Sequence, residues 1–204
     1  MWLRKLEKAR PKNFSKNLYD SIKEYTEKSY YYDFKQIHNA EFFDQLKPRI
    51  RHRLVNALFS SFVSNFFYLF NDAEFEAGCE FTSNFLSNIY SRLYLPGNTI
   101  VNHGEHFSEF VMIQEGVVSL QMRLGQDLNS EQEFFVLPTY SYFGDYQILF
   151  DLKSQIIYKA KENKLLITLC LDKSKLLELM DDFPEARKFY MERAWLRRIE
   201  FRRR

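Results

Sequence analysis

The sequence predicts an α+β fold in which helices come first, an antiparallel β-roll follows, and two helices end the chain. Apolar residues recur at helical spacing up to about residue 90. Short β-rich runs bounded by turn residues then replace them as far as residue 171, and helical spacing returns from residue 172. Short strands separated in this way are typical of a compact roll or barrel.

Residues 1–70 are expected to form several short amphipathic helices with basic outer faces. Ser15 is suited to the N-cap of the first helix, because its hydroxyl can accept a hydrogen bond from a free backbone N–H. A second short helix is expected over 40–46, and Pro48 favours the first turn of a third. Apolar residues at helical spacing support the first and third helices: Leu18, Ile22 and Tyr25, then Ile50, Leu54 and Leu58.

Residues 71–204 are expected to form the roll and its flanking helices. Asn71 and Glu74 fit a capping box at the start of a helix that runs to residue 89. After the last strand, Asp172 is suited to cap a helix that ends near residue 180, and Pro184 begins a final helix to residue 204. Between these helices the sequence predicts six strands, at 92–95, 99–102, 110–113, 117–122, 133–137 and 165–171. Turn residues separate them, among them Pro96, Gly97, Gly104 and Gly116.

Composition places the chain among globular proteins. Hydrophobic residues make up 46% of its 204 residues, whereas it has only 6 Gly and 5 Pro, which argues against a low-complexity or disordered class. Cys79 and Cys170 have no partner at ligand spacing and are interpreted as ordinary thiols. The longest apolar stretch, 57–70, is interrupted by polar residues and is shorter than the roughly 20 residues that span a bilayer. We therefore expect this chain to be soluble, with any membrane part of its parent protein lying outside it.

Charge is unevenly distributed along the chain. Residues 1–60 hold 13 basic and 7 acidic residues (+6), residues 61–150 hold 2 and 11 (−9), and residues 151–204 hold 14 and 9 (+5), which sum to the net charge of +2. On this pattern, the acidic central section is expected to repel an anionic ligand.

Several function classes lack their motifs. No nucleophile motif of the Ser/His/Asp or Cys/His kind and no phosphate loop is present, so an enzyme is not predicted. His103, Glu105 and His106 lie on an expected turn without a further metal ligand at known spacing. The C-terminal arginines offer a basic surface, but no helix-turn-helix pattern follows the roll, so nucleic acid is not a predicted partner.

Three motifs, in order, carry a resemblance to cyclic-nucleotide-binding domains. LPGNTI at 95–100 with Gly104 and Glu105, FVMIQEGVV at 110–118, and SYFGD at 141–145 resemble that family's turn-and-strand, its strand–turn–strand and the opening of its phosphate-binding cassette. The basic segment 42–54 is similar to the helical linker of cyclic-nucleotide-gated, hyperpolarisation-activated and ether-à-go-go-type channels. The resemblance covers about residues 14–204 and implies two parts, a linker at 1–70 and a roll with flanking helices at 71–204.

The cassette departs from the pattern of nucleotide-binding members. In those members a Glu receives the ribose 2′-hydroxyl and an Arg contacts the cyclic phosphate. By position Gly144 is kept, Asp145 replaces the Glu, and Ser154 stands where the Arg is expected, with Lys153 and Gln155 as the nearest polar substitutes. Loss of a charged hydrogen bond of about 1.5–3 kcal/mol weakens binding roughly ten- to over a hundredfold. The resemblance therefore implies weak or absent binding of cAMP or cGMP, and no other cofactor.

Ether-à-go-go-type domains similarly have an Asp at the cassette opening and lack the Arg, and a segment after their last helix folds back into the pocket. Residues 196–204 resemble that segment, with a solvated basic helix end as the alternative.

The resemblance implies a cytosolic gating module of a tetrameric cation channel, either potassium-selective or non-selective. Its partners would be identical subunits, through the linker, and the transmembrane pore of the same protein. Three alternatives stay open: a genuine cAMP or cGMP sensor within a channel, a nucleotide sensor outside channels, such as a kinase regulatory subunit or signalling adaptor, and a transporter with the same roll.

Overall fold

The computed structural model describes residues 20, 23, 45–70, 78–123, 131–161 and 165–203. By its internal contacts the chain divides into residues 1–33 and 34–204, and the helices and strands from residue 45 onward belong to the second unit. Within the described ranges, no helix combines the length and the apolar character needed to cross a bilayer. Apart from residues 20 and 23, the helix expected at 15–25 lies outside the described residues, as do most of the helix expected at 40–46 and the capping box at 71–74.

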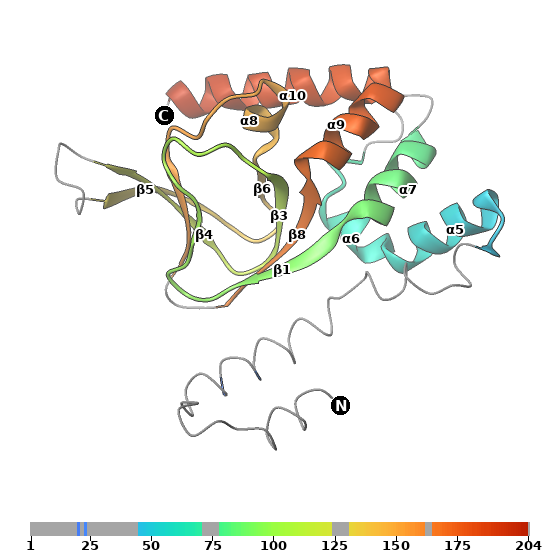
Figure 1. Cartoon of the computed structure of the whole chain (residues 1–204), viewed down its shortest axis with the longest axis horizontal. Helices are drawn as coiled ribbons and strands as arrows, with labels where there is room; N and C mark the ends of the chain where they lie inside the picture. The colour runs from blue at the N-terminus through green and yellow to red at the C-terminus, as the bar shows by residue number, and fades with distance from the viewer. Residues whose placement is uncertain are drawn as a thin grey trace. The chain divides into compact units, whose positions relative to one another are not determined.

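Two four-stranded antiparallel sheets form the predicted β-roll (Figure 1). The first sheet has the order β1-β8-β3-β6, and the second has the order β2-β7-β4-β5. The strands of the first sheet are β1 (Tyr90–Tyr94), β8 (Leu166–Asp172), β3 (Glu109–Glu115) and β6 (Tyr142–Phe143). Those of the second are β2 (Thr99–Val101), β7 (Ile157–Ala160), β4 (Val118–Arg123) and β5 (Glu131–Leu137).

Six of these strands agree with the predicted ones to within two residues at each end, and β6 and β7 were not predicted. Strand β6 has two residues, which is too short to show an alternating pattern. Strand β7 follows the cassette with no Gly or Pro in front of it, and its first, second and fourth residues are all buried. Such a strand has no alternation of polar and apolar residues by which it would be recognised.

Gly116 shows why glycine is needed between β3 and β4. Its φ is +97°, and a Cβ added there would lie 2.8 Å from the carbonyl oxygen of Leu165. Both the left-handed backbone and the close approach therefore exclude a side chain.

Helices precede and follow the roll along the chain. Before it come α5 (Pro48–Leu58), α6 (Ser60–Asn65) and α7 (Gly78–Asn88). The five-residue α8 (Asp145–Leu149) lies within the roll, and α9 (Lys173–Asp182) and α10 (Pro184–Arg203) follow it. Pro48 and Pro184 begin their helices as predicted, and Asp172 is the N-cap residue of α9, although its side chain makes no capping hydrogen bond. In Figure 1, α10 runs across the roll beside α8.

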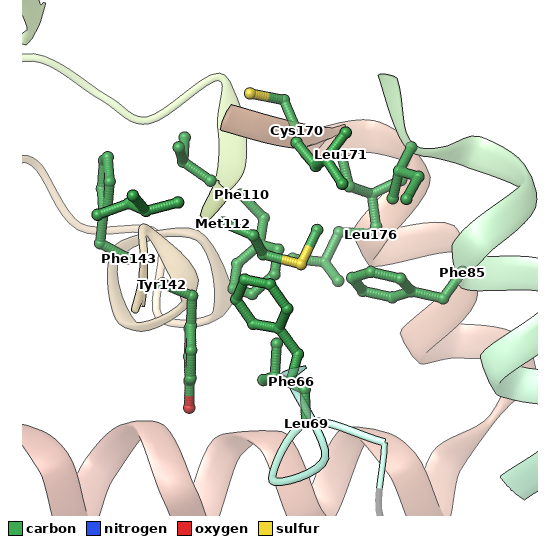
Figure 2. Close-up of a cluster of buried hydrophobic side chains, with 14 of the residues drawn as sticks. Phe66, Leu69, Phe85, Phe110, Met112, Tyr142, Phe143, Cys170, Leu171 and Leu176 are labelled. Carbon is green, nitrogen blue, oxygen red and sulfur yellow. The ribbon is translucent and has the colours of Figure 1, made fainter. Parts of the chain in front are cut away.

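An aromatic core joins the helices to the roll. Phe66 and Leu69, from the segment after α6, lie in the same cluster as Phe85 of α7 and Phe110 of β3 (Figure 2). The rings of Phe85 and Phe110 are 6.0 Å apart in an edge-to-face arrangement. Residues 45–70 thus share one hydrophobic core with the strands. The domain boundary predicted near residue 70 stays a prediction.

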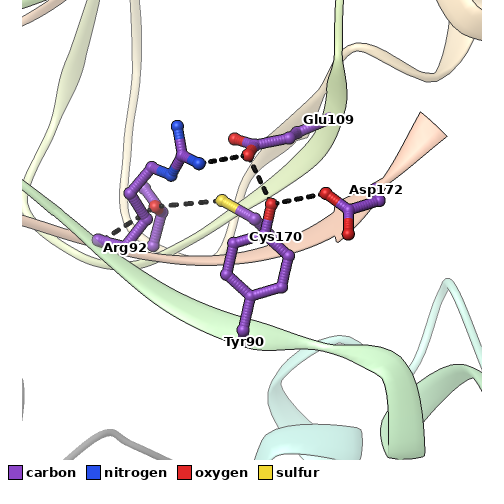
Figure 3. A network of polar contacts seen from close by, with 6 residues as sticks. Tyr90, Arg92, Glu109, Cys170 and Asp172 are labelled. Carbon is purple, nitrogen blue, oxygen red and sulfur yellow. Dashed lines mark hydrogen bonds and ion pairs between the residues drawn. The ribbon is translucent and has the colours of Figure 1, made fainter.

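A polar network spans three strands of the first sheet (Figure 3). The carboxylate of Glu109 is buried and forms an ion pair with Arg92 at 2.5 Å. The Tyr90 hydroxyl lies against Glu109 and, at 2.8 Å, against Asp172, the residue that precedes α9. Burial, followed by hydrogen bonding to the two carboxylates, raises the pKa of Tyr90 above its ordinary value. The network ties the starts of β1 and β3 to the end of β8.

Candidate functional site

The cassette opening is shaped by one glycine. Gly144 follows β6 with a φ of +96° and precedes α8. A Cβ at this position would lie 2.9 Å from both the Glu109 carbonyl oxygen and Cδ1 of Phe107. The chain therefore turns sharply here and places Asp145 at the first position of α8, where its side chain is almost fully buried.

A cavity of about 260 Å³ lies between the roll and α10. Most of its lining is apolar or aromatic, and Asp145 with two arginines of α10 supplies its charge. The lining residues are Leu120, Phe135, Leu137, Tyr142, Phe143, Gly144, Asp145, Tyr146, Gln147, Ile156, Tyr158, Ala194, Arg197 and Arg198. A cavity of this kind, with aromatic walls and few convergent polar groups, is typical of small-molecule sites.

Arg197 reaches from α10 to the carboxylate of Asp145. Its guanidinium forms an ion pair with Asp145 and lies 3.8 Å from the centre of the Tyr142 ring. It also donates a 3.4 Å hydrogen bond to the Tyr142 carbonyl oxygen. Burial is the largest single influence and disfavours its charge, but the Asp145 carboxylate, together with Tyr142 and Tyr158, raises the pKa of Arg197 on balance. The carboxylate of Asp145 is thus already neutralised by a guanidinium of α10.

Arg198 lies at the opposite end of the cassette segment. It donates a hydrogen bond to the side-chain oxygen of Gln155, and its guanidinium is 5.6 Å from the centre of the Tyr146 ring. Since Tyr146 belongs to α8 and Gln155 comes just before β7, Arg198 connects the two ends of the cassette.

Aromatic stacking forms the inner wall. The rings of Phe143 and Tyr158 are 4.7 Å apart at an angle of 15°, and both residues are buried. Burial raises the pKa of Tyr158 to about 12, so its hydroxyl keeps its proton at neutral pH. These rings offer a flat apolar surface to a planar ligand.

The structure separates the five residues that the sequence singled out. Gly144 and Asp145 line the cavity, whereas Lys153, Ser154 and Gln155 do not. Ser154 is 2% exposed, and its hydroxyl donates a 2.6 Å hydrogen bond to the Ile156 carbonyl oxygen. Lys153 is exposed and pairs through its backbone with His106. Gln155 contacts the site through the hydrogen bond that its side-chain oxygen accepts from Arg198.

Sequence reasoning did not include Arg197 or Arg198 among the site residues, although it compared residues 196–204 with a segment that folds back into the pocket after the last helix. Residues 196–203 instead continue α10, and Arg197 and Arg198 line the cavity from that helix. The available signal was their position on the last helix. Ala186, Tyr190 and Ala194 recur every four residues and are buried, so this face of α10 lies against the body of the protein. Arg197 follows three residues after Ala194 and so lies close to that face.

Comparisons with known proteins agree with this fold. No protein-family model and no curated protein matches the sequence. Among solved structures, the chain is similar to the regulatory domain of Toxoplasma gondii PKA, determined in a co-crystal with cAMP, with a TM-score of 0.55 and 15% sequence identity. The match covers 68% of this chain and 49% of the other, so the chain spans about half the length of that neighbour. At this identity the likeness establishes the fold, which is that of cyclic-nucleotide-binding domains.

Proposed function

We propose that this chain is a non-catalytic regulatory module in which α10 acts as a lid over the roll. The ion pair between Arg197 and Asp145 is the main support for this proposal. Both residues line the pocket, so a ligand bound there would change the contact that holds α10 against the cassette. The matched structure is itself a regulatory domain, which supports a regulatory role.

Cyclic nucleotides are the ligands that this pocket fits best, with weak binding. The 260 Å³ cavity and its aromatic walls suit a nucleotide base and sugar. Two features oppose tight binding: the Asp145 carboxylate is held by Arg197, and Ser154, at the position of the family's arginine, carries no charge and does not line the cavity. We therefore expect cAMP and cGMP to bind with dissociation constants in the high micromolar range or above.

The lid also contacts the helical segment that precedes the roll. The Tyr190 hydroxyl donates a 2.8 Å hydrogen bond to the Leu69 carbonyl oxygen, and Arg193 donates one to the Tyr68 carbonyl oxygen. The Tyr68 ring stacks on Tyr142, 5.6 Å away, and Tyr142 lies beneath Arg197. Any shift of α10 at the pocket would therefore be felt at residues 68–69, which supports a coupling role.

The wider context is proposed from the resemblance carried by the sequence. We propose that residues 1–70 are the linker through which four copies assemble on the cytosolic face of a cation channel, and that the roll biases its gate. Analytical ultracentrifugation of the full chain tests this assembly. We expect the fraction of tetramer to rise with protein concentration. A chain that stays monomeric at all concentrations would contradict the channel hypothesis and favour a sensor outside channels.

Calorimetric titration with cAMP and cGMP tests the ligand. The wild-type chain should bind weakly, and the Ser154→Arg, Gln155→Thr double variant should bind roughly ten- to a hundredfold more tightly, since a guanidinium returns to the cassette. Ser61→Arg, on the exposed face of α6, adds the same charge away from the cavity and should change nothing. Low-micromolar binding by the wild type would contradict the weak-binding prediction, and no gain in the double variant would contradict the cassette alignment.

A further inference from the structure

We propose that the lid helix supplies the anion-binding group of this pocket, and that Arg198 takes the place of the missing cassette arginine. This inference rests on the proposed function, because it assigns the group that would hold the ligand's phosphate. It makes the pocket selective for a planar aromatic monoanion, the chemical class to which cyclic nucleotides belong.

The charges of the cavity lead to this assignment. Within the described lining, the charged side chains are Asp145, Arg197 and Arg198. Asp145 and Arg197 form an ion pair and cancel, which leaves one positive charge on Arg198. The described partner of Arg198 is the neutral side-chain oxygen of Gln155, so its charge is not balanced by a carboxylate. A ligand with a single negative charge would balance it.

Unused donors strengthen the case. The Nε atoms of Arg197 and Arg198 are buried, and neither has a hydrogen-bond partner in the part of the chain that the structure describes. A buried donor without a partner destabilises the folded state, because it has lost its hydrogen bonds to water. An acceptor-rich group between the lid and the cassette, such as a cyclic phosphate, would satisfy them.

Position also favours Arg198. It is held between Tyr146 of α8 and Gln155, and Gln155 is the neighbour of Ser154, where nucleotide-binding members have their arginine. The guanidinium thus arrives at the same end of the cassette from a different element. Because it belongs to α10, the ligand's charge would be bound only when the lid is closed, so phosphate recognition and lid closure become one event.

The test compares three ligands that differ in charge. Adenosine is neutral, cAMP carries one negative charge, and AMP carries close to two. Calorimetric titrations with each, up to about 10 mM and at low and physiological salt, should show that the wild type prefers cAMP to adenosine. In Arg198→Gln the affinity for cAMP should fall roughly ten- to a hundredfold and become equal to that for adenosine. Arg198→Lys should keep part of the preference, because it keeps the charge but not the fork of donors.

Controls separate this inference from the proposed function. Arg187→Gln removes an exposed arginine from the same helix and should leave all three affinities unchanged, and thermal melts show whether each variant folds. If Arg198→Gln binds cAMP as the wild type does, the lid assignment is wrong and the nucleotide pocket stands. If only the Ser154→Arg, Gln155→Thr double variant binds, the lid assignment is also wrong. If neither the wild type nor that double variant binds any of the three ligands, both the inference and the proposed ligand class fail.

Discussion

At the scale of single residues, Gly144 and Asp145 decide the shape and charge of the pocket. The glycine permits a backbone turn that no side chain fits, and the turn buries the carboxylate that follows it. The two residues are neighbours in sequence, but Gly144 matters because it has no side chain and Asp145 because it is charged.

Gly144→Ala should therefore destabilise the protein. A left-handed alanine costs about 1–2 kcal/mol, and overpacking against the Phe107 ring and the Glu109 carbonyl oxygen adds roughly 1–3 kcal/mol. Gly104→Ala is the matched control, since Gly104 has a φ of +82° but no atom within 4 Å of an added Cβ. Urea unfolding should show the larger loss for Gly144→Ala, and equal losses would contradict the close approach.

The ion pair between Asp145 and Arg197 can be measured by a double-mutant cycle. Arg197→Met leaves a buried carboxylate without its partner, which should cost about 2–4 kcal/mol, less than for a fully buried pair because Arg197 is partly exposed. Adding Asp145→Asn removes the stranded charge and should recover part of that loss. A coupling energy near zero in urea unfolding would show that the pair does not hold the lid.

At the scale of elements, α10 is the helix that connects the others. It is bonded to the segment after α6 through Tyr190 and to the cassette through Arg197 and Arg198. Its outer face is less buried than the face that packs against the protein, since Trp195 and Leu196 are about half exposed. A helix fastened by side chains at separate points can open locally without unfolding of the roll.

Arg197→Met should loosen the C-terminal half of α10. Hydrogen exchange of backbone amides around residues 194–199 should become faster, while amides in α7 keep their rates, because α7 is fixed by the aromatic core. Arg187→Met provides the control, since its pair with Asp181 is exposed on both sides. Faster exchange throughout the protein would mean that the variant is globally destabilised and that α10 is no separate lid.

At the scale of the whole molecule, buried hydroxyl and thiol groups make the fold sensitive to alkali. Burial raises the pKa of both Cys170 and Tyr158 to about 12, from ordinary values of 9.0 and 10.0. Burial also raises the pKa of Tyr68, Tyr142 and Tyr94. These groups keep their protons in the folded chain where the unfolded chain loses them.

Stability should therefore be full below about pH 9 and fall as the pH rises towards 12, because the folded state then binds more protons than the unfolded state. Urea midpoints measured across this range check the direction. Tyr158→Phe keeps the stacked ring and should flatten the decline above pH 10. A midpoint that stays constant up to pH 12 would contradict the burial of these groups.

Much of the fold could be predicted from sequence because it is specified locally. The glycine turns, Pro48 and Pro184 at helix starts, and six of the eight strands follow from residue type and short-range spacing. Strand β6 was too short and β7 too uniformly buried to show a pattern. The cassette opening at Gly144 and Asp145 was found in the same way, as a motif of neighbouring residues.

The net charge of the site depends on contacts that form only in the folded chain. In sequence the cassette opening belongs to a section with a net charge of −9, which predicted repulsion of anions. Folding brings Arg197 across 52 residues to Asp145, and Arg198 across 43 residues to Gln155. Folding also buries Ser154 outside the cavity lining, where its hydroxyl bonds to the Ile156 carbonyl oxygen. The start of the cassette at Gly144 and Asp145 can be predicted from sequence, because turns depend on adjacent residues. Which groups fill the pocket depends on contacts between distant elements, which local patterns do not encode.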